Sequence, residues 1–182
     1  MLLDKNELRI KYKDIRNQLE DSERFNKSVK IGTSLFNHPY YQKAKTIGFY
    51  VSLEEEVETI LLIEEALKNR KRICVPKVEG DEIRFYRIKS LVDLQEGTYN
   101  IYEPTTPYIT RPNKMDLIVV PMIGFNKKKY RLGYGGGYYD RYLKDYKGHT
   151  IGLAFDDCLI EEDFQDEHDL PMELIITEDK IY

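Results

Sequence analysis

The chain of 182 residues has no tryptophan, only two cysteines and no long apolar run. Cys74 and Cys158 stand in different contexts without a Cys-x-x-Cys pair, so we interpret them as reduced core thiols rather than a disulfide. No apolar stretch approaches the ~20 residues of a membrane span, so no membrane helix is expected. The start of the chain turns charged at Asp4 and Lys5, which predicts that no signal peptide is present. We therefore expect a cytoplasmic protein.

Basic blocks are also lacking, and the formal net charge is −4 at pH 7. This balance gives no sign of a nucleic-acid surface, so no nucleic-acid partner is expected. The three histidines, His38, His149 and His168, are scattered and indicate no zinc site. No Ser-His-Asp or Cys-His arrangement for a catalytic nucleophile can be argued from the sequence.

Apolar spacing predicts an α/β fold. Helical spacing occurs over 4–19, 21–36, 58–69 and 138–147, and short apolar runs predict strands over 46–51, 72–76, 83–88, 116–121, 150–154 and 174–177. Strand, helix and strand over 46–76 form a βαβ unit, which implies a parallel sheet. Residues 91–95 should form a short helical turn, 97–114 a surface loop and 126–130 an exposed turn. We predict a single domain, 1–182, with three layers and a mostly parallel, Rossmann-like sheet flanked by helices.

Glycine is concentrated in the segment 131–141, with four copies at 133, 135, 136 and 137. Such a segment can aim several backbone N–H groups at one anion. It follows the predicted strand 116–121 and opens the predicted helix 138–147, a place that favours phosphate. It is not a Walker A loop, because no Gly-Lys-Ser/Thr closes it, and it does not fit the dinucleotide fingerprint. A tight connection that needs glycine for steric reasons alone is the alternative.

Two charged residues add to this segment. Arg131 can supply positive charge, and Asp140 lies in the first turn of the predicted helix, where the dipole stabilises a carboxylate. A carboxylate there can hold Mg²⁺, which usually takes one or two carboxylates plus phosphate oxygens. A plain role as a helix cap is equally compatible with the sequence. Together these parts predict a site for a metal–nucleotide.

The pattern Arg-Leu-Gly-x-Gly-x-Gly-Tyr-Tyr-Asp at 131–140 resembles the signature of the 5-formyltetrahydrofolate cyclo-ligase family, also called 5,10-methenyltetrahydrofolate synthetases. The resemblance covers nearly the whole chain. Lys5 and Arg9 match its opening Lys-x-x-x-Arg, and the segments 50–59, 101–104 and 116–121 sit where it has similar blocks. The chain departs at Met122, where the family often has Gly, and at Asn126, where it often has Asp. Both lie shortly before the glycine segment and affect its expected shape.

The resemblance implies an ATP-dependent ligase with small-molecule substrates and Mg²⁺, acting as a monomer. ATP and 5-formyltetrahydrofolate would give 5,10-methenyltetrahydrofolate, ADP and phosphate. The formyl oxygen attacks the γ-phosphate, N10 closes the ring on the resulting iminium phosphate, and phosphate leaves. Phosphorylation makes a good leaving group of a poor one, so catalysis is mainly positioning and charge neutralisation.

The resemblance also implies binding roles for individual residues, and it leaves open which residue, if any, handles the proton at N10. ATP would be bound by Lys5, Arg9, Arg131, Leu132, Gly133, Tyr134, Gly135, Gly136, Gly137, Tyr138 and Tyr139. The folate would meet Val51, Glu56, Tyr134, Gly135, Gly136, Gly137 and Tyr138, with Glu56 accepting pterin N–H donors. Asp140 and Asp169 would be the Mg²⁺ ligands.

By themselves these residues allow plainer interpretations. Lys5 and Arg9, four apart on one helix face, also suit a solvated basic face. Glu56 also suits a first-turn helix acid before Glu58, and Asp169 is one acid in a run of them. Two other functions stay open as well. A sugar-phosphate isomerase or acyl-transfer relative would need no ATP, and a nucleotide- or folate-binding module would bind without turnover.

Overall fold

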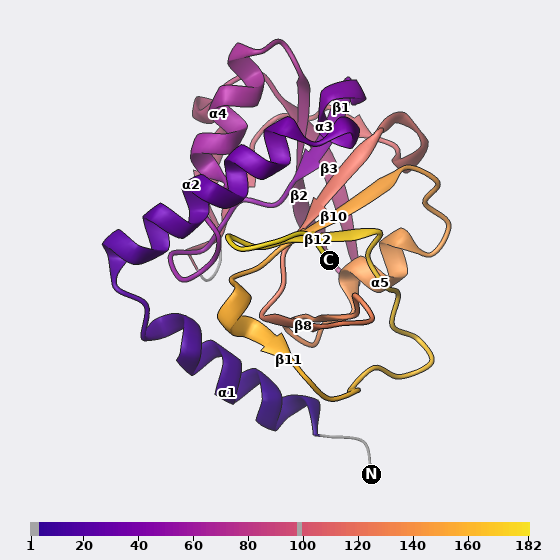
Figure 1. Ribbon diagram of the computed structural model, residues 1–182. Helices are drawn as coiled ribbons and strands as arrows, with labels where there is room; N and C mark the ends of the chain where they lie inside the picture. The colour runs from indigo at the N-terminus through magenta and orange to yellow at the C-terminus, as the bar shows by residue number, and fades with distance from the viewer. Residues whose placement is uncertain (1–3, 98–99) are drawn as a thin grey trace.

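A computed structural model describes residues 4–97 and 100–182 (Figure 1). The expectations that fall on 1–3 (absence of a signal peptide) and on 98–99 (surface loop) lie outside the described residues. The centre is a seven-stranded sheet of order β12-β10-β7-β1-β2-β3-β6. Its strands are β1 (Thr46–Phe49), β2 (Arg72–Glu79), β3 (Glu82–Ile88), β6 (Ile109–Thr110), β7 (Leu117–Val120), β10 (His149–Leu153) and β12 (Leu174–Ile176).

The sheet is mostly parallel, as predicted. Strand β1 pairs in parallel with β2 and β7, and β10 pairs in parallel with β7 and β12. Only the edge formed by β2, β3 and β6 is antiparallel. The central strands β1 and β7 are buried along their whole length, which explains why their sequences read as continuous apolar runs.

Helices cover both faces of the sheet, which confirms the three layers (Figure 1). Helices α2 (Asp21–Asn37) and α4 (Ile60–Lys68) share one core with Ile47 and Phe49 of β1. Helix α5 (Tyr138–Leu143) packs on the opposite face with Phe85 and Ile118. The short α3 (Pro39–Lys43) follows α2, whereas α1 (Lys5–Asn17) lies away from the sheet, beside the turn at 156–158.

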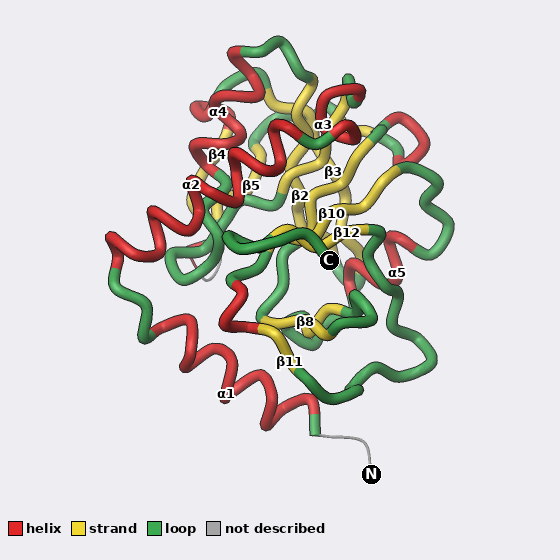
Figure 2. Tube along the Cα trace, in the orientation of Figure 1, coloured by secondary structure: helices red, strands yellow, loops and turns green. Residues whose placement is uncertain are grey.

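Element ends differ from the predictions where the period is weak. The helix predicted over 58–69 begins only at Ile60, and that over 138–147 ends at Leu143. The predicted loop 97–114 contains β5 (Tyr102–Pro104), β6 and a 3₁₀ turn, Pro112–Lys114. The turn expected over 91–95 is a 3₁₀ turn, Leu91–Asp93, followed by β4 (Leu94–Glu96), which pairs with β5. Figure 2 shows β4 and β5 as short strands. Strands of two or three residues are too short to show an alternation of apolar and polar residues in the sequence.

A second, three-stranded sheet carries the glycine segment. It consists of β8 (Gly124–Asn126), β9 (Arg131–Leu132) and β11 (Leu159–Ile160). The predicted turn at 126–130 joins β8 to β9. Asn126 shapes it, because its Oδ1 accepts the N–H groups of Lys128 and Tyr130 while its amide donates to Gln165. An aspartate could accept the first two bonds but could not donate the third.

Both cysteines are free and buried, which agrees with the interpretation as reduced core thiols. Burial raises the pKa of the Cys158 thiol to about 12, so this group stays protonated near neutral pH. Within 4–97 and 100–182, no helix combines the length and the apolar character that crossing a membrane requires.

Replacing Phe49 by alanine should lower the free energy of unfolding by about 3–5 kcal/mol, because its ring is fully buried in the core between β1 and the helices. Urea denaturation measures this loss. The matched control is Phe25→Ala on α2, whose side chain is 48% exposed and which should change stability by less than about 0.5 kcal/mol. Equal losses in both variants would contradict this description of the core.

Candidate functional site

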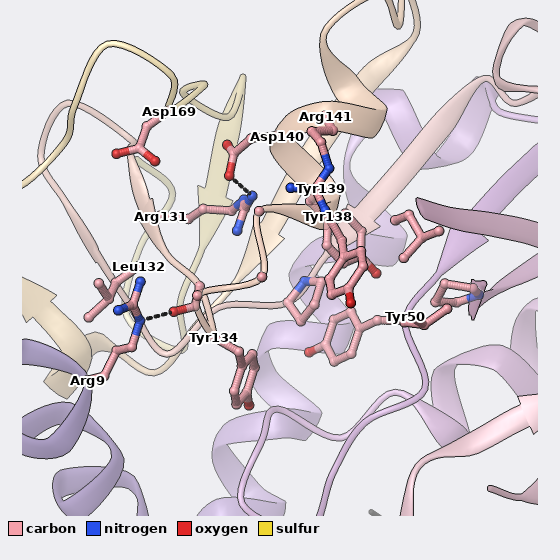
Figure 3. A pocket seen from close by; sticks show the side chains of 18 of the residues that line it. Arg9, Tyr50, Arg131, Leu132, Tyr134, Tyr138, Tyr139, Asp140, Arg141 and Asp169 are labelled. Carbon is pink, nitrogen blue, oxygen red and sulfur yellow. Dashed lines mark hydrogen bonds and ion pairs between the residues drawn. The ribbon is translucent and has the colours of Figure 1, made fainter. Parts of the chain in front are cut away.

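A cavity of about 1190 Å³ opens where β1 and β7 end, and it gathers every site residue predicted from the sequence. Figure 3 shows part of its lining, including Arg9, Arg131 and Asp140. The wall of the cavity takes in Tyr50 and Val51 after β1, Pro121 after β7, the glycine segment, and part of α1. The predicted residues on this wall are Lys5, Arg9, Val51, Glu56, Arg131, Leu132, Gly133, Tyr134, Gly135, Gly136, Gly137, Tyr138, Tyr139, Asp140 and Asp169. This volume lies above the range of about 300–1,000 Å³ that is typical of pockets for one small ligand.

Each glycine of the segment meets a steric demand. Gly135 and Gly137 have φ of +106° and +67°, which disfavour other residues. A Cβ on Gly133 would lie 2.6 Å from Nη1 of Arg131, and one on Gly136 would lie 2.5 Å from the Tyr138 ring. The steric explanation therefore holds most strictly at Gly135 and Gly137, whose φ is positive, because the atoms close to Gly133 and Gly136 belong to the ends of side chains that can shift. It does not compete with a binding role, because the same glycines line the cavity.

The helix that follows the glycines is shorter than predicted. Helix α5 has six residues, with Gly137 as its N-cap. So few aligned peptide units give a weaker dipole than the predicted ten-residue helix would have. Charged side chains, more than the helix end, must therefore stabilise any anion bound here.

Arg131 is such a side chain, and it is more ordered than a loop residue. It lies in β9 and is 8% exposed, so the glycine segment begins on a strand of the second sheet. Its Nη2 donates to Oδ2 of Asp140 over 2.6 Å (Figure 3), and its guanidinium lies 5.6 Å from the centre of the Tyr139 ring. Its Nε is buried and has no hydrogen-bond partner in the part of the chain that the structure describes. Leu132 beside it is buried in the core.

Helix α1 brings two more cations to the cavity. Nζ of Lys5 donates to Asp169 over 2.5 Å and to Asp166 over 2.7 Å, and Nε of Arg9 donates to the carbonyl of Gly133 over 2.8 Å. Burial lowers the pKa of Lys5, but the bonds to both carboxylates outweigh it and raise the pKa overall. Because Lys5 and Arg9 bond to other segments of the protein, this end of α1 is not a solvated basic face.

The two predicted metal ligands lie near each other. Oδ1 of Asp140 accepts the backbone N–H of Leu170, the neighbour of Asp169. In the described ranges, no three His, Cys, Asp or Glu side chains gather to form a metal cage. Mg²⁺ usually takes one or two carboxylates and completes its shell with phosphate oxygens and water. The pair therefore fits a magnesium ion that arrives with a phosphate ligand.

A buried carboxylate occupies another part of the wall. Glu56 is 5% exposed and sits in the turn before α4, so it is not a first-turn helix acid. Burial raises its pKa, while hydrogen bonds from the Tyr134 hydroxyl (2.5 Å) and the Leu53 N–H (2.8 Å) and the charge of Arg16 oppose this. Arg16 was not predicted from the sequence. Its signal is the helical spacing with Leu8 and Tyr12, which places it on the buried face of α1.

Comparisons with known proteins show which family the chain belongs to. The sequence model of the 5-formyltetrahydrofolate cyclo-ligase family matches residues 2–178. The chain belongs to this family. It is 30% identical to the 5-formyltetrahydrofolate cyclo-ligase of Mus musculus, over 94% of this chain and 92% of that one, and 33% identical to that of Mycoplasma pneumoniae, over 97% and 100%.

A solved structure supports the same cyclo-ligase membership. The 5,10-methenyltetrahydrofolate synthetase of Aquifex aeolicus superposes with a TM-score of 0.88 at 37% identity, covering 97% of this chain and 91% of that one. The three-layer fold is therefore shared within the family. Family membership makes the chain an enzyme of the ligase type, which favours this interpretation over an isomerase or a binding module.

Gly137→Ala should damage the site beyond its cost in stability. A Cβ there adds strain at φ +67° and would lie 2.7 Å from Nη1 of Arg141, a cavity residue. Gly80→Ala is the matched control, with φ +63° in the β2–β3 turn and no described atom within 4 Å. Both should lose about 1–2 kcal/mol in urea denaturation. Only Gly137→Ala should also weaken ATP binding in calorimetry, and equal affinity in both variants would show that the glycine serves stability alone.

Proposed function

We propose that this enzyme closes 5-formyltetrahydrofolate to 5,10-methenyltetrahydrofolate, using ATP and Mg²⁺ and releasing ADP and phosphate. The observation that carries the proposal is one cavity lined by the glycine segment, by cationic side chains that include Lys5, Arg9 and Arg131, and by the buried carboxylate of Glu56. We propose small molecules as its only partners and action as a monomer in the cytoplasm, where free thiols such as Cys74 and Cys158 are common.

The triphosphate would lie on the cationic side. Lys5 and Arg9 reach this side from α1 and Arg131 from β9, and all three line the cavity. Arginine suits this role because its planar fork can hold two phosphate oxygens at once. The backbone of 132–139 would wrap the phosphates, since its glycines remove side chains from the path.

Asp140 and Asp169 would hold the Mg²⁺ that accompanies ATP. Each carboxylate now faces a cation, Arg131 and Lys5 respectively. A bound metal–triphosphate would replace both ion pairs: the two carboxylates would bind the metal, and Arg131 and Lys5 would bind phosphate oxygens. When bound, Mg²⁺ would supply positive charge at the phosphates that these side chains position.

The folate would lie on the side of Glu56. A carboxylate with two oxygens can accept paired N–H groups of a pterin ring. Val51 and the rings of Tyr134 and Tyr138 lie on the same wall and offer apolar surface for a flat heterocycle. The glycine segment would thus touch both substrates, with Tyr134 and Tyr138 toward the folate.

This arrangement suits a two-step group transfer. The formyl oxygen attacks the γ-phosphorus, the bond to the ADP oxygen breaks, and ADP leaves. N10 then attacks the formyl carbon, loses its proton, and expels phosphate as the C–O bond breaks. The cations at the phosphates neutralise charge in the first step, and the shared cavity holds the two reacting atoms together.

A direct assay mixes the protein with Mg²⁺, ATP and 5-formyltetrahydrofolate and follows the near-ultraviolet absorbance of the methenyl product. We expect one ADP released for each product formed, and no product when ATP is left out. Product without ATP, or ADP release without product, would contradict the proposal.

Two variants test whether the activity depends on residues of the cavity. Arg131→Ala should raise the KM for ATP about tenfold or more, as expected for the loss of a charge-assisted hydrogen bond. Lys128→Ala, an exposed cation paired with Asp163 and outside the cavity wall, is the matched control and should keep the KM of the parent enzyme.

A further inference from the structure

Arg16 is an unusual residue for its place in the fold. It lies near the end of α1, is 2% exposed, and belongs to the same buried helix face as Leu8 and Tyr12. Burying a charge is costly, and a well-packed apolar side chain of similar size often serves stability as well or better. Anchoring of α1 therefore does not by itself require an arginine at this position.

The hydrogen bonds of Arg16 lead to the cavity wall, although Arg16 itself is not among the residues that line it. Nη2 donates to the Tyr134 hydroxyl over 3.1 Å and to Oε1 of Glu55 over 3.4 Å, and Nη1 donates to the carbonyl of Met122 over 3.2 Å. The Tyr134 hydroxyl donates in turn to Oε1 of Glu56 over 2.5 Å. Because its oxygen accepts from Arg16, its single proton is directed toward Glu56.

The charges around Glu56 show what Arg16 contributes. Its charged and titratable neighbours are Arg16 of α1, Tyr134 of the glycine segment, Tyr139 of α5, Tyr50 after β1, and Glu55. Arg16 is the cation in this set. Burial raises the pKa of Glu56, and the positive charge of Arg16 acts against that rise. Without it, Glu56 would take up a proton at a higher pH.

We propose that Arg16 is a positioning residue for the folate half of the cavity: it holds the Tyr134 hydroxyl against Glu56 without touching either substrate. The inference rests on the proposed function, because it takes Glu56 as the acceptor for the folate. It also gives α1 a second task, since the helix carries Lys5 and Arg9 to the phosphates at one end and supports the folate carboxylate at the other.

Arg16→Gln tests the proposal, because it removes the charge and retains polar groups. We expect the KM for 5-formyltetrahydrofolate to rise about tenfold and the KM for ATP to change by less than about twofold. The folate KM of the variant should also rise as the pH is lowered, and this rise should begin at a higher pH than in the parent enzyme, because Glu56 without the charge of Arg16 takes up its proton more readily.

Two further variants separate positioning from stability. Arg16→Lys keeps the charge but lacks the fork, so it should raise the folate KM less and leave its pH profile as in the parent enzyme. Arg24→Gln is the matched structural control: Arg24 of α2 also bonds the end of α1, through the carbonyl of Arg16, and the turn after it, through the carbonyl of Leu19, but lies outside the cavity wall. It should lower the free energy of unfolding without moving the folate KM.

An unchanged folate KM in Arg16→Gln, or a parallel rise in both KM values with no change in pH profile, would overturn the proposal. If Arg16→Gln does not fold, Tyr134→Phe decides: it cuts the link from Arg16 to Glu56, and an unchanged folate KM would again contradict the inference. The parent enzyme is assayed in every series. If it forms no methenyl product, the proposed function fails; if it is active and Arg16 has no effect, only the positioning role fails.

Discussion

Two ion pairs hold the walls of the cavity together. Arg131 of β9 bonds Asp140 of α5, and Lys5 of α1 bonds Asp169 of the loop before β12. The first pair links the two ends of the glycine segment, nine residues apart, and the second joins α1 to a loop 164 residues further along the chain. Exposed ion pairs contribute little to stability, but Arg131 is nearly buried and both pairs face the same cavity. The charges that shape the cavity are those that a metal–nucleotide would need.

The central sheet supplies the frame on which this arrangement depends. Strands β1 and β7 are completely buried, so the segments that follow them begin from fixed points. Tyr50 and Val51 follow β1 in the cavity wall, and β8 and β9 carry the chain from β7 to the glycine segment. The shape of the cavity therefore depends on packing in the core as well as on the residues that line it.

The sequence predicted the elements that show a repeated apolar spacing and the segment in which glycine is concentrated. The parallel strands, helices α2 and α4 and the glycine segment were all visible, because apolar period and glycine content are local signals. The length of α5, the strand position of Arg131 and the pairing of β4 with β5 depend on contacts between distant segments. Arg16 was missed because a cation on an apolar helix face becomes informative only when its partners, Tyr134 and Glu55, are known.

The central claim is that the cavity exchanges its internal ion pairs for a metal–nucleotide. Calorimetry with a non-hydrolysable ATP analogue, with and without Mg²⁺, in the parent enzyme and in Asp140→Asn, tests it most directly. We predict at least about tenfold tighter binding with Mg²⁺ in the parent enzyme, or about 1.4 kcal/mol, and loss of most of that difference in the variant. Equal affinity with and without Mg²⁺ in the parent enzyme would contradict the account.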